Sequence, residues 1–338
     1  MMEKLIVINP GFQATIQDLG RPAFQSDGFP VSGFIDWFSG RLANILLNNK
    51  ADASEIEFSL VGPEIIFKAP SFIAITGGQC FPKLNGKLIV TNQAVRIRTG
   101  DHLKIGPIKN GRFGYLAISG GFFVKEVMGS RSTTLRLNLG GYLGRPLKKG
   151  DRLKYKNCNY LPCLAYRKIN QKIINEHKIL SLRILPGPQW NMFSYTDKKQ
   201  FQTQLYKITD EADRMGFRIY GKSLAKKSAN MLSEATVEGG IQITAGGQPI
   251  ILLSDRQTTG GYPIIATVLK SDIPRLVQSQ NEQLIKFSLV NLKEAQRVFI
   301  QKINTLKKIK TTISLQKFKE PIGINRPTAQ RIQTLFRR

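Results

Sequence analysis

The segment GIQITAGGQPIILLSDRQTTGGYP, residues 240–263, contains two short apolar runs, Gly240–Thr244 and Pro249–Ser254, joined by a glycine-rich turn. Short apolar runs closed by glycine, proline, asparagine or aspartate are typical of β-strands joined by tight turns. Similar runs recur at Lys4–Ile8, Glu64–Phe67, Ser71–Ile75, Lys87–Thr91, Phe113–Ile118 and Leu182–Leu185. The 30 glycines of the chain fit many such turns. The sequence therefore predicts a mainly β fold with a few helices, built from barrels or sandwiches rather than βαβ units.

Two segments instead place apolar residues at helical spacing. Ser32–Asn48 carries one apolar stripe and offers Ser32 as an N-cap. Leu292–Ile303 carries the second stripe. Both stripes are predicted to pack against the core.

The composition changes along the chain and predicts four parts. Residues 1–165 form a β-rich N-terminal domain, and the polar, lysine-rich residues 166–180 form a linker. Residues 181–301 form a second β-rich domain. Residues 302–338 are basic with little apolar pattern, which predicts a partly disordered tail.

The net charge of +27 over 338 residues invites a nucleic-acid interpretation. Lys and Arg are scattered over the chain, however, and no nucleic-acid-binding motif is present, so no specific nucleic-acid partner is expected. The apolar stretches are too short to span a bilayer, and the first residues do not resemble a signal peptide. We therefore expect a cytoplasmic protein without a membrane partner. Three cysteines and two histidines, without a Cys-x-x-Cys pair, predict no metal site.

The polar loop after the strand Pro249–Ser254 is the strongest candidate for a functional site. It projects a carboxylate, a guanidinium, an amide and two hydroxyls from Asp255, Arg256, Gln257, Thr258 and Thr259 before a diglycine. Such a group can bind a small polar molecule, although a solvated turn is the alternative. As a projecting loop it is expected to contribute little to the core.

Three further clusters carry polar residues between glycines. Residues 129–133, GSRST, combine an arginine with hydroxyls and backbone amides that suit an anion, or form a polar loop. Residues 17–22, QDLGRP, and residues 213–216, DRMG, are the other two. Residues 216–223, GFRIYGKS, match the P-loop expression, but their bulky centre predicts a strand instead.

These motifs, taken in order with PVSGFID at residues 30–36, resemble the KipA family. That family is also called allophanate hydrolase subunit 2 or biotin-dependent carboxyltransferase, and it includes C subunits of ATP-dependent 5-oxoprolinase. The resemblance implies cyclophilin-like β-barrel domains and a complex with a KipI-like B subunit and a LamB/YcsF-like A subunit. It also implies use of ATP with Mg in the complex, for hydrolysis of 5-oxo-L-proline to L-glutamate. Biotin-dependent carboxyl transfer to a urea-like substrate and sequestration of a kinase inhibitor stay open as alternatives.

We predict one pocket built from residues 131–133, 213–214 and 255–259, and the roles of its side chains are hypotheses. Asp255, Gln257, Thr258 and Thr259 are predicted to be catalytic, with Asp255 polarising a water or orienting an arginine. The predicted substrate-binding residues are Arg131, Ser132, Thr133, Asp213, Arg214, Arg256 and Tyr262. Arg131 and Arg214 would hold a carboxylate or phosphoryl oxygens. Ile264 stands where the family usually has a lysine, which bears on substrate specificity.

Overall fold

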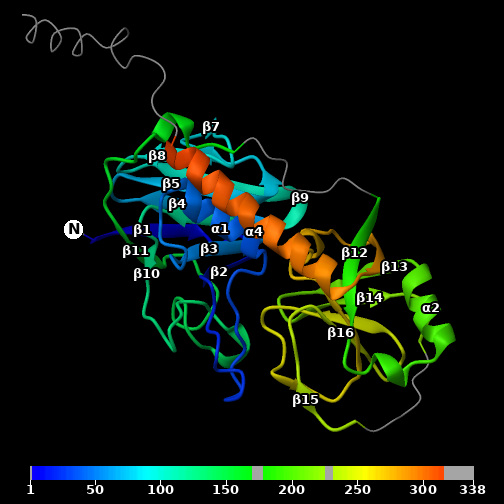
Figure 1. Cartoon of the computed structure of the whole chain (residues 1–338). Helices are drawn as coiled ribbons and strands as arrows, with labels where there is room; N and C mark the ends of the chain where they lie inside the picture. The colour runs from blue at the N-terminus through cyan, green and yellow to red at the C-terminus, as the bar shows by residue number, and fades with distance from the viewer. Residues whose placement is uncertain (1, 170–177, 225–230, 316–338) are drawn as a thin grey trace, which may run out of the picture.

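The computed structural model describes residues 2–169, 178–224 and 231–315, which form two β-rich halves (Figure 1). The strands of the first half are β1 (Met2–Asn9), β2 (Gln13–Gln17), β3 (Glu55–Ser59), β4 (Val61–Phe67), β5 (Ser71–Cys80), β6 (Lys83–Leu84), β7 (Lys87–Leu88), β8 (Ala94–Ile97), β9 (His102–Ile118), β10 (Phe122–Phe123) and β11 (Arg152–Lys156). They form one 11-stranded sheet. Short 3-10 turns lie at Leu135–Leu137, Leu164–Tyr166 and Trp190–Met192.

Strand β9 organises the first half because it pairs with four other strands along its 17 residues. Its first part pairs with β4 and β6, and its second part with β3 and β5. The second part, from Gly111 to Ile118, is buried on both faces. The sheet can therefore curl around a core of wholly buried Ile, Leu and Phe side chains such as Leu5, Ile56 and Leu116.

Helix α1 (Trp37–Leu46) packs on this sheet and begins later than the sequence predicted. Its N-cap is Asp36, whose side chain accepts a hydrogen bond from the backbone N of Ser39 at 3.0 Å. The prediction of Ser32 as the cap was wrong. Ser32 has a φ of 55°, and its hydroxyl lies 2.7 Å from that of Thr134. Ser32 is therefore used by the loop that reaches the neighbouring turn.

The second half contains a closed barrel in the order β12-β19-β16-β17-β14-β13-β20. Its strands are β12 (Ile179–Pro186), β13 (Tyr206–Ala212), β14 (Gly216–Tyr220), β16 (Gly240–Ile243), β17 (Pro249–Leu252), β19 (Ile264–Val268) and β20 (Leu284–Leu289). A two-stranded ladder of β15 (Glu234–Ala235) and β18 (Thr259–Gly260) stands beside it. Helices α2 (Tyr195–Thr203) and α3 (Ile273–Val277) complete this half. The predicted mainly β class with barrel architecture is confirmed.

Helix α4 (Leu292–Leu315) leaves the barrel and returns across the first half, where it lies over α1 (Figure 1). Its Leu306 is buried against Trp37, Phe38 and Leu42 of α1. The predicted second helix is thus present but continues 12 residues past Ile303. Residues 302–315 were assigned to a basic tail, and this part of the assignment was wrong because Leu306 and Ile313 are buried. Residues 316–338 and most of the predicted linker lie outside the described residues.

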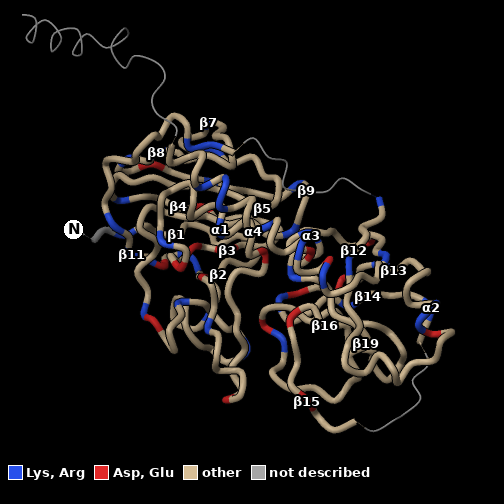
Figure 2. Tube along the Cα trace, in the orientation of Figure 1, with Lys and Arg blue, Asp and Glu red and all other residues tan. Residues whose placement is uncertain are grey.

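Positive charge is distributed over the described part of both halves and is not collected on one stripe (Figure 2). In those residues, no helix is long and apolar enough to cross a membrane.

Candidate functional site at the junction of the two halves

A buried ion cluster joins the halves. Arg214, in the turn between β13 and β14, donates from Nε to Oδ2 of Asp255 at 2.8 Å and from Nη2 to Oδ1 at 3.1 Å. Its Nη1 contacts Oε1 of Glu57 on β3, and its Nη2 also donates to the carbonyl of Gly33 at 2.8 Å. Arg214, Asp255 and Glu57 are each at most 7% exposed. The cluster therefore ties both strand systems together away from water.

The electrostatics of this cluster explain why Arg214 is held so firmly. Burial lowers the pKa of Arg214, but the charges of Asp255 and Glu57 outweigh this effect and raise the pKa above its usual value. Glu57 in turn accepts from the hydroxyl of Tyr115 at 2.8 Å and from the backbone N of Ile35 at 3.0 Å. Because its donors are engaged by the protein, Arg214 is a support for the site rather than the predicted clamp for a substrate carboxylate.

The loop with Arg131, Ser132 and Thr133 is organised by Asp18. Asp18 accepts from the hydroxyls of Ser130 and Ser132 and from the backbone N of Arg131 at 2.5–2.6 Å. Ser132 and Thr133 are wholly buried. The side chain of Arg131 turns away and pairs with Glu126 at 2.8 Å. The structure therefore does not bring these three residues into one pocket with Asp255.

A cavity of about 650 Å³ opens beside Arg214 and holds several other predicted residues. Asp213, Gln257 and Tyr262 line it together with Arg214. Two residues that the sequence analysis missed, Arg112 and Gln242, line it too. The volume is in the usual range for small-molecule sites. Amides, a phenol and carboxylates around a partly apolar floor can orient a small polar amide by hydrogen bonds.

The loop after β17 divides its residues between structure and cavity. Asp255 and Arg256 are buried, whereas Gln257 and Thr259 are exposed. The carbonyl of Thr258 accepts from the backbone N of Thr236 at 2.9 Å, and Thr259 forms strand β18. The loop thus differs from the projecting loop that the sequence predicted, because its first residues are buried and Thr259 is in a strand. Arg256 faces a different, smaller cavity.

The missed residues carried weak sequence signals. Glu57 lies between Ile56 and Phe58 in a strand. A carboxylate between apolar residues indicates a buried charge that needs a partner. Arg112 follows a glycine inside β9, and its guanidinium donates to the carbonyl of Ser279 at 3.1 Å. Both patterns indicate a buried charge, but neither predicts which residue of the other half is its partner.

The structure also describes the segment that matches the P-loop expression and one of the two histidines. The P-loop match begins with strand β14 (Gly216–Tyr220), as predicted, and so lacks a phosphate loop at that point. Nε2 of His102 lies 2.8 Å from Oε1 of Glu64 at the sheet surface. Within residues 2–169, 178–224 and 231–315, no group of three or more His, Cys, Asp or Glu is arranged to hold a metal ion.

Comparison with known proteins gives a consistent result. The family model described as carboxyltransferase domain, subdomain A and B, matches residues 27–289. The chain is 33% identical to the 5-oxoprolinase C subunit of Escherichia coli, over 86% of this chain and 93% of that protein. It is 35% identical to the 5-oxoprolinase C subunit of Haemophilus influenzae, over 85% of this chain and 91% of that protein.

A solved structure with a similar fold is that of a larger protein. The urea amidolyase of Kluyveromyces lactis superposes on this chain with a TM-score of 0.83 and 26% sequence identity. The match covers 90% of this chain and 20% of the urea amidolyase. The barrel and the curled sheet therefore occur together as one module of that larger protein.

Proposed function

This chain belongs to the carboxyltransferase family of subdomains A and B, and we propose that it acts as the C subunit of an ATP-dependent 5-oxoprolinase. The observation that carries the proposal is its similarity, over most of both chains, to two proteins named as C subunits of 5-oxoprolinase. That name implies a multi-subunit complex. The proposed partners are a KipI-like B subunit and a LamB/YcsF-like A subunit, which together would open 5-oxo-L-proline to L-glutamate.

The 650 Å³ cavity is the proposed place for the lactam. Gln257 comes from the loop after β17, Gln242 from β16, and Tyr262 from the segment before β19. An amide side chain both donates and accepts, so it can pair with the N–H and the C=O of a lactam. The ion pair of Arg214 with Asp255 anchors the start of the loop that carries Gln257.

ATP with Mg is proposed for the complex without a named site in this chain. In the described residues the P-loop match around β14 begins with a strand, and no group of three or more His, Cys, Asp or Glu is arranged to hold a metal ion. No step of the ATP chemistry is therefore assigned to this chain, and ATP use is proposed for the assembled complex.

The test is reconstitution with the A and B subunits and measurement of glutamate release. We expect release to require ATP, 5-oxoproline and all three subunits. Gln257→Leu should lower turnover by about tenfold to a hundredfold, the scale for removing a polar group that hydrogen-bonds near the reacting atoms. Gln202→Leu, which removes an amide bonded only within α2, is the matched control. Glutamate release by this chain alone, or none from the complete set, would contradict the proposal.

The second candidate is carboxyl transfer from biotin to a urea-like substrate, favoured by the superposition on urea amidolyase. Biotin carries a cyclic urea, and the amides that line the cavity can hydrogen-bond a cyclic urea as well as a lactam. The same purified chain should then support carboxylation when a biotinylated carrier and its carboxylase are added. A glutamate-producing complex that ignores the biotinylated carrier rules this candidate out.

A further inference from the structure

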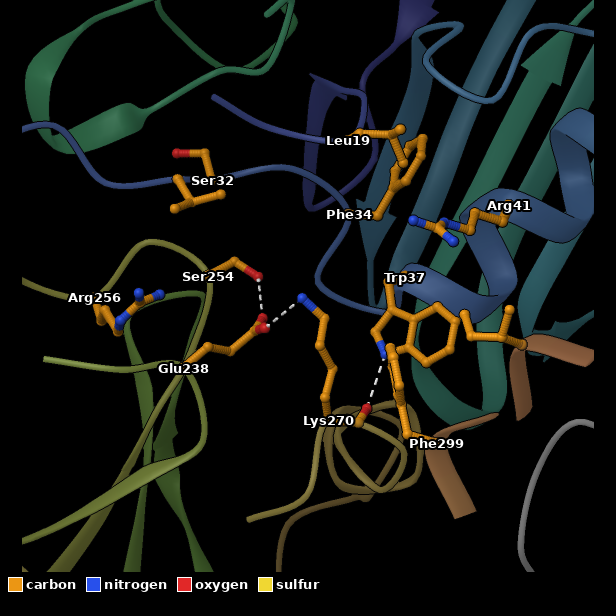
Figure 3. Close-up of a pocket in the computed structure, with 12 residues that line it drawn as sticks. Leu19, Ser32, Phe34, Trp37, Arg41, Glu238, Ser254, Arg256, Lys270 and Phe299 are labelled. Carbon is orange, nitrogen blue, oxygen red and sulfur yellow. Dashed lines mark hydrogen bonds and ion pairs between the residues drawn. The ribbon is translucent and has the colours of Figure 1, made fainter. Parts of the chain in front are cut away.

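A second, smaller cavity of about 220 Å³ lies between the halves (Figure 3). It shares no lining residue with the 650 Å³ cavity. Phe34, Trp37 and Arg41 reach it from the first half, and Glu238, Ser254, Arg256 and Lys270 from the second. Phe299 of α4 adds an aromatic wall. The cavity is therefore built by three separate parts of the chain and exists only when they are folded together.

The cations of this cavity are not fully paired. Nε of Arg256 and Nε of Arg41 are buried and have no hydrogen-bond partner. Arg256 is only 8% exposed, and its other nitrogens donate to the carbonyl of Leu253 and to Oε1 of Gln25 at 3.4 and 3.1 Å. A buried guanidinium donor without a partner costs free energy, which a bound acceptor would recover. Arg256 therefore points to a ligand that accepts hydrogen bonds.

The charge balance of the lining also favours an anion. Arg41, Arg256 and Lys270 supply three positive charges, whereas Glu238 supplies one negative charge and already pairs with Lys270 at 3.4 Å. Burial lowers the pKa of both Arg41 and Arg256, the effect expected for cations with too little opposite charge nearby. One added negative charge would reduce the excess.

The walls define the rest of the ligand. The indole N–H of Trp37 donates to the carbonyl of Lys270 at 2.9 Å, which fixes the ring at the cavity wall. Phe34 and Phe299 add further apolar surface (Figure 3). Inorganic phosphate would leave these rings in contact with water, whereas a small ring or alkyl group would cover them.

We propose that this cavity binds a small organic carboxylate, with the carboxylate on Arg256 and an apolar body against Trp37. A guanidinium and a carboxylate match in shape and charge, which makes this pairing stronger than a neutral hydrogen bond. The inference does not require the proposed function, because binding can be measured on this chain alone.

The test is fluorescence titration of the full chain carrying Trp190→Phe, which leaves Trp37 as its single tryptophan. Four probes separate the possible ligand chemistries: 5-oxoproline, cyclopentanecarboxylate, the neutral lactam 2-pyrrolidone and inorganic phosphate. Both carboxylates should change the emission of Trp37 with saturation. The neutral lactam and phosphate should not. Arg256→Gln should weaken carboxylate binding at least about tenfold, the effect of losing a charged hydrogen-bond partner.

Two further variants make the outcome decisive. Arg256→Lys keeps the positive charge but loses the guanidinium, so it should also weaken binding, and it serves if Arg256→Gln does not fold. Arg297→Gln removes an exposed arginine that pairs with Glu294 on α4 and should leave binding unchanged. The proposal is overturned by an equal response to 2-pyrrolidone, by preference for phosphate, by binding that survives Arg256→Gln, or by no saturable response up to about 10 mM probe.

Discussion

Two glutamates on strand β3 differ in whether a buried carboxylate has a cation as its partner. Glu55 and Glu57 are both wholly buried and lie two residues apart. Glu57 reaches Arg214, whereas neither carboxylate oxygen of Glu55 has a hydrogen-bond partner among the described residues. Burial, reinforced by the charge of Glu57, raises the pKa of Glu55 well above its usual value, and the backbone N–H of Asn44 offsets only part of this. Burial thus favours the neutral form of Glu55 in the folded chain.

This difference predicts a pH dependence of stability. In the folded state Glu55 binds its proton up to a higher pH than in the unfolded chain, so stability is present at low pH and is lost as pH rises above about 4.3. The loss is at most about 1.4 kcal/mol per pH unit for one proton. Glu55→Gln, which stays neutral, should flatten the decline in the free energy of unfolding between about pH 5 and pH 8. Urea unfolding at several pH values measures it, with the exposed Asp52→Asn as control. An unchanged slope in Glu55→Gln would contradict this assignment.

At the same scale, the sequence indicated more clearly which polar residues matter than where their side chains point. It marked Arg131, Arg214 and Asp255 as polar groups of unusual density, and Arg214 and Asp255 do meet. Arg131 points to Glu126 instead because its backbone, not its side chain, is what Asp18 holds. The sequence shows which groups are available, whereas contacts formed in the folded chain, such as that of Arg214 with Asp255, determine where each side chain points.

At the scale of elements, the sequence of helix α4 carries apolar residues at helical spacing, but its high lysine content led to the prediction of a tail. Ile303, Leu306, Ile309 and Ile313 follow at helical spacing, yet the lysines between them suggested a tail. Strand β9 was likewise predicted only as Phe113–Ile118, although it runs from His102. Its earlier half alternates buried and exposed side chains around Gly106 and Gly111, which resemble turn residues in the sequence. Local propensity therefore located the elements but not their full lengths.

The packing of α4 predicts a contrast between two leucines. Leu306 is 5% exposed in the contact with α1, whereas Leu315 is 71% exposed. Leu306→Ala should lower the free energy of unfolding by about 2–5 kcal/mol, because it removes buried apolar area and leaves a cavity. Leu315→Ala should change it by less than about 0.5 kcal/mol. Chemical denaturation of both variants provides the measurement, and equal effects would mean that α4 does not stabilise the fold.

At the scale of the whole molecule, buried polar groups cross the junction together with apolar ones such as Ile35 and Phe113. Besides Arg214, the amide of Gln278 donates to Oδ2 of Asp36 and to the carbonyl of Phe113, each at 2.9 Å. Asp36 also caps α1, so the cap, the sheet and the barrel share one network. A buried network of this kind stabilises one relative placement of the halves because few other placements satisfy its donors.

Removal of the central cation should therefore cost more than removal of either anion. Arg214→Gln leaves Glu57 and Asp255 buried without their cation and should destabilise the chain by about 3–5 kcal/mol. Asp255→Asn leaves Arg214 paired with Glu57 and should destabilise it less. These predicted losses of stability differ from the sequence-based expectation that the loop after β17 contributes little to the core. Urea unfolding gives the order directly, and a larger loss for Asp255→Asn would show that the charge balance of the cluster is different.

The path of α4 has a consequence for how the chain is made. Helix α1 leaves the ribosome early, but the surface that covers it lies more than 250 residues later, around Leu306 and Ile313. Until those residues emerge, Phe38 and Leu42 of the nascent chain lack this cover while the barrel between them is already being translated. Helix α4 therefore covers α1 late, and the interval before α4 is made is when the growing chain most needs protection from aggregation.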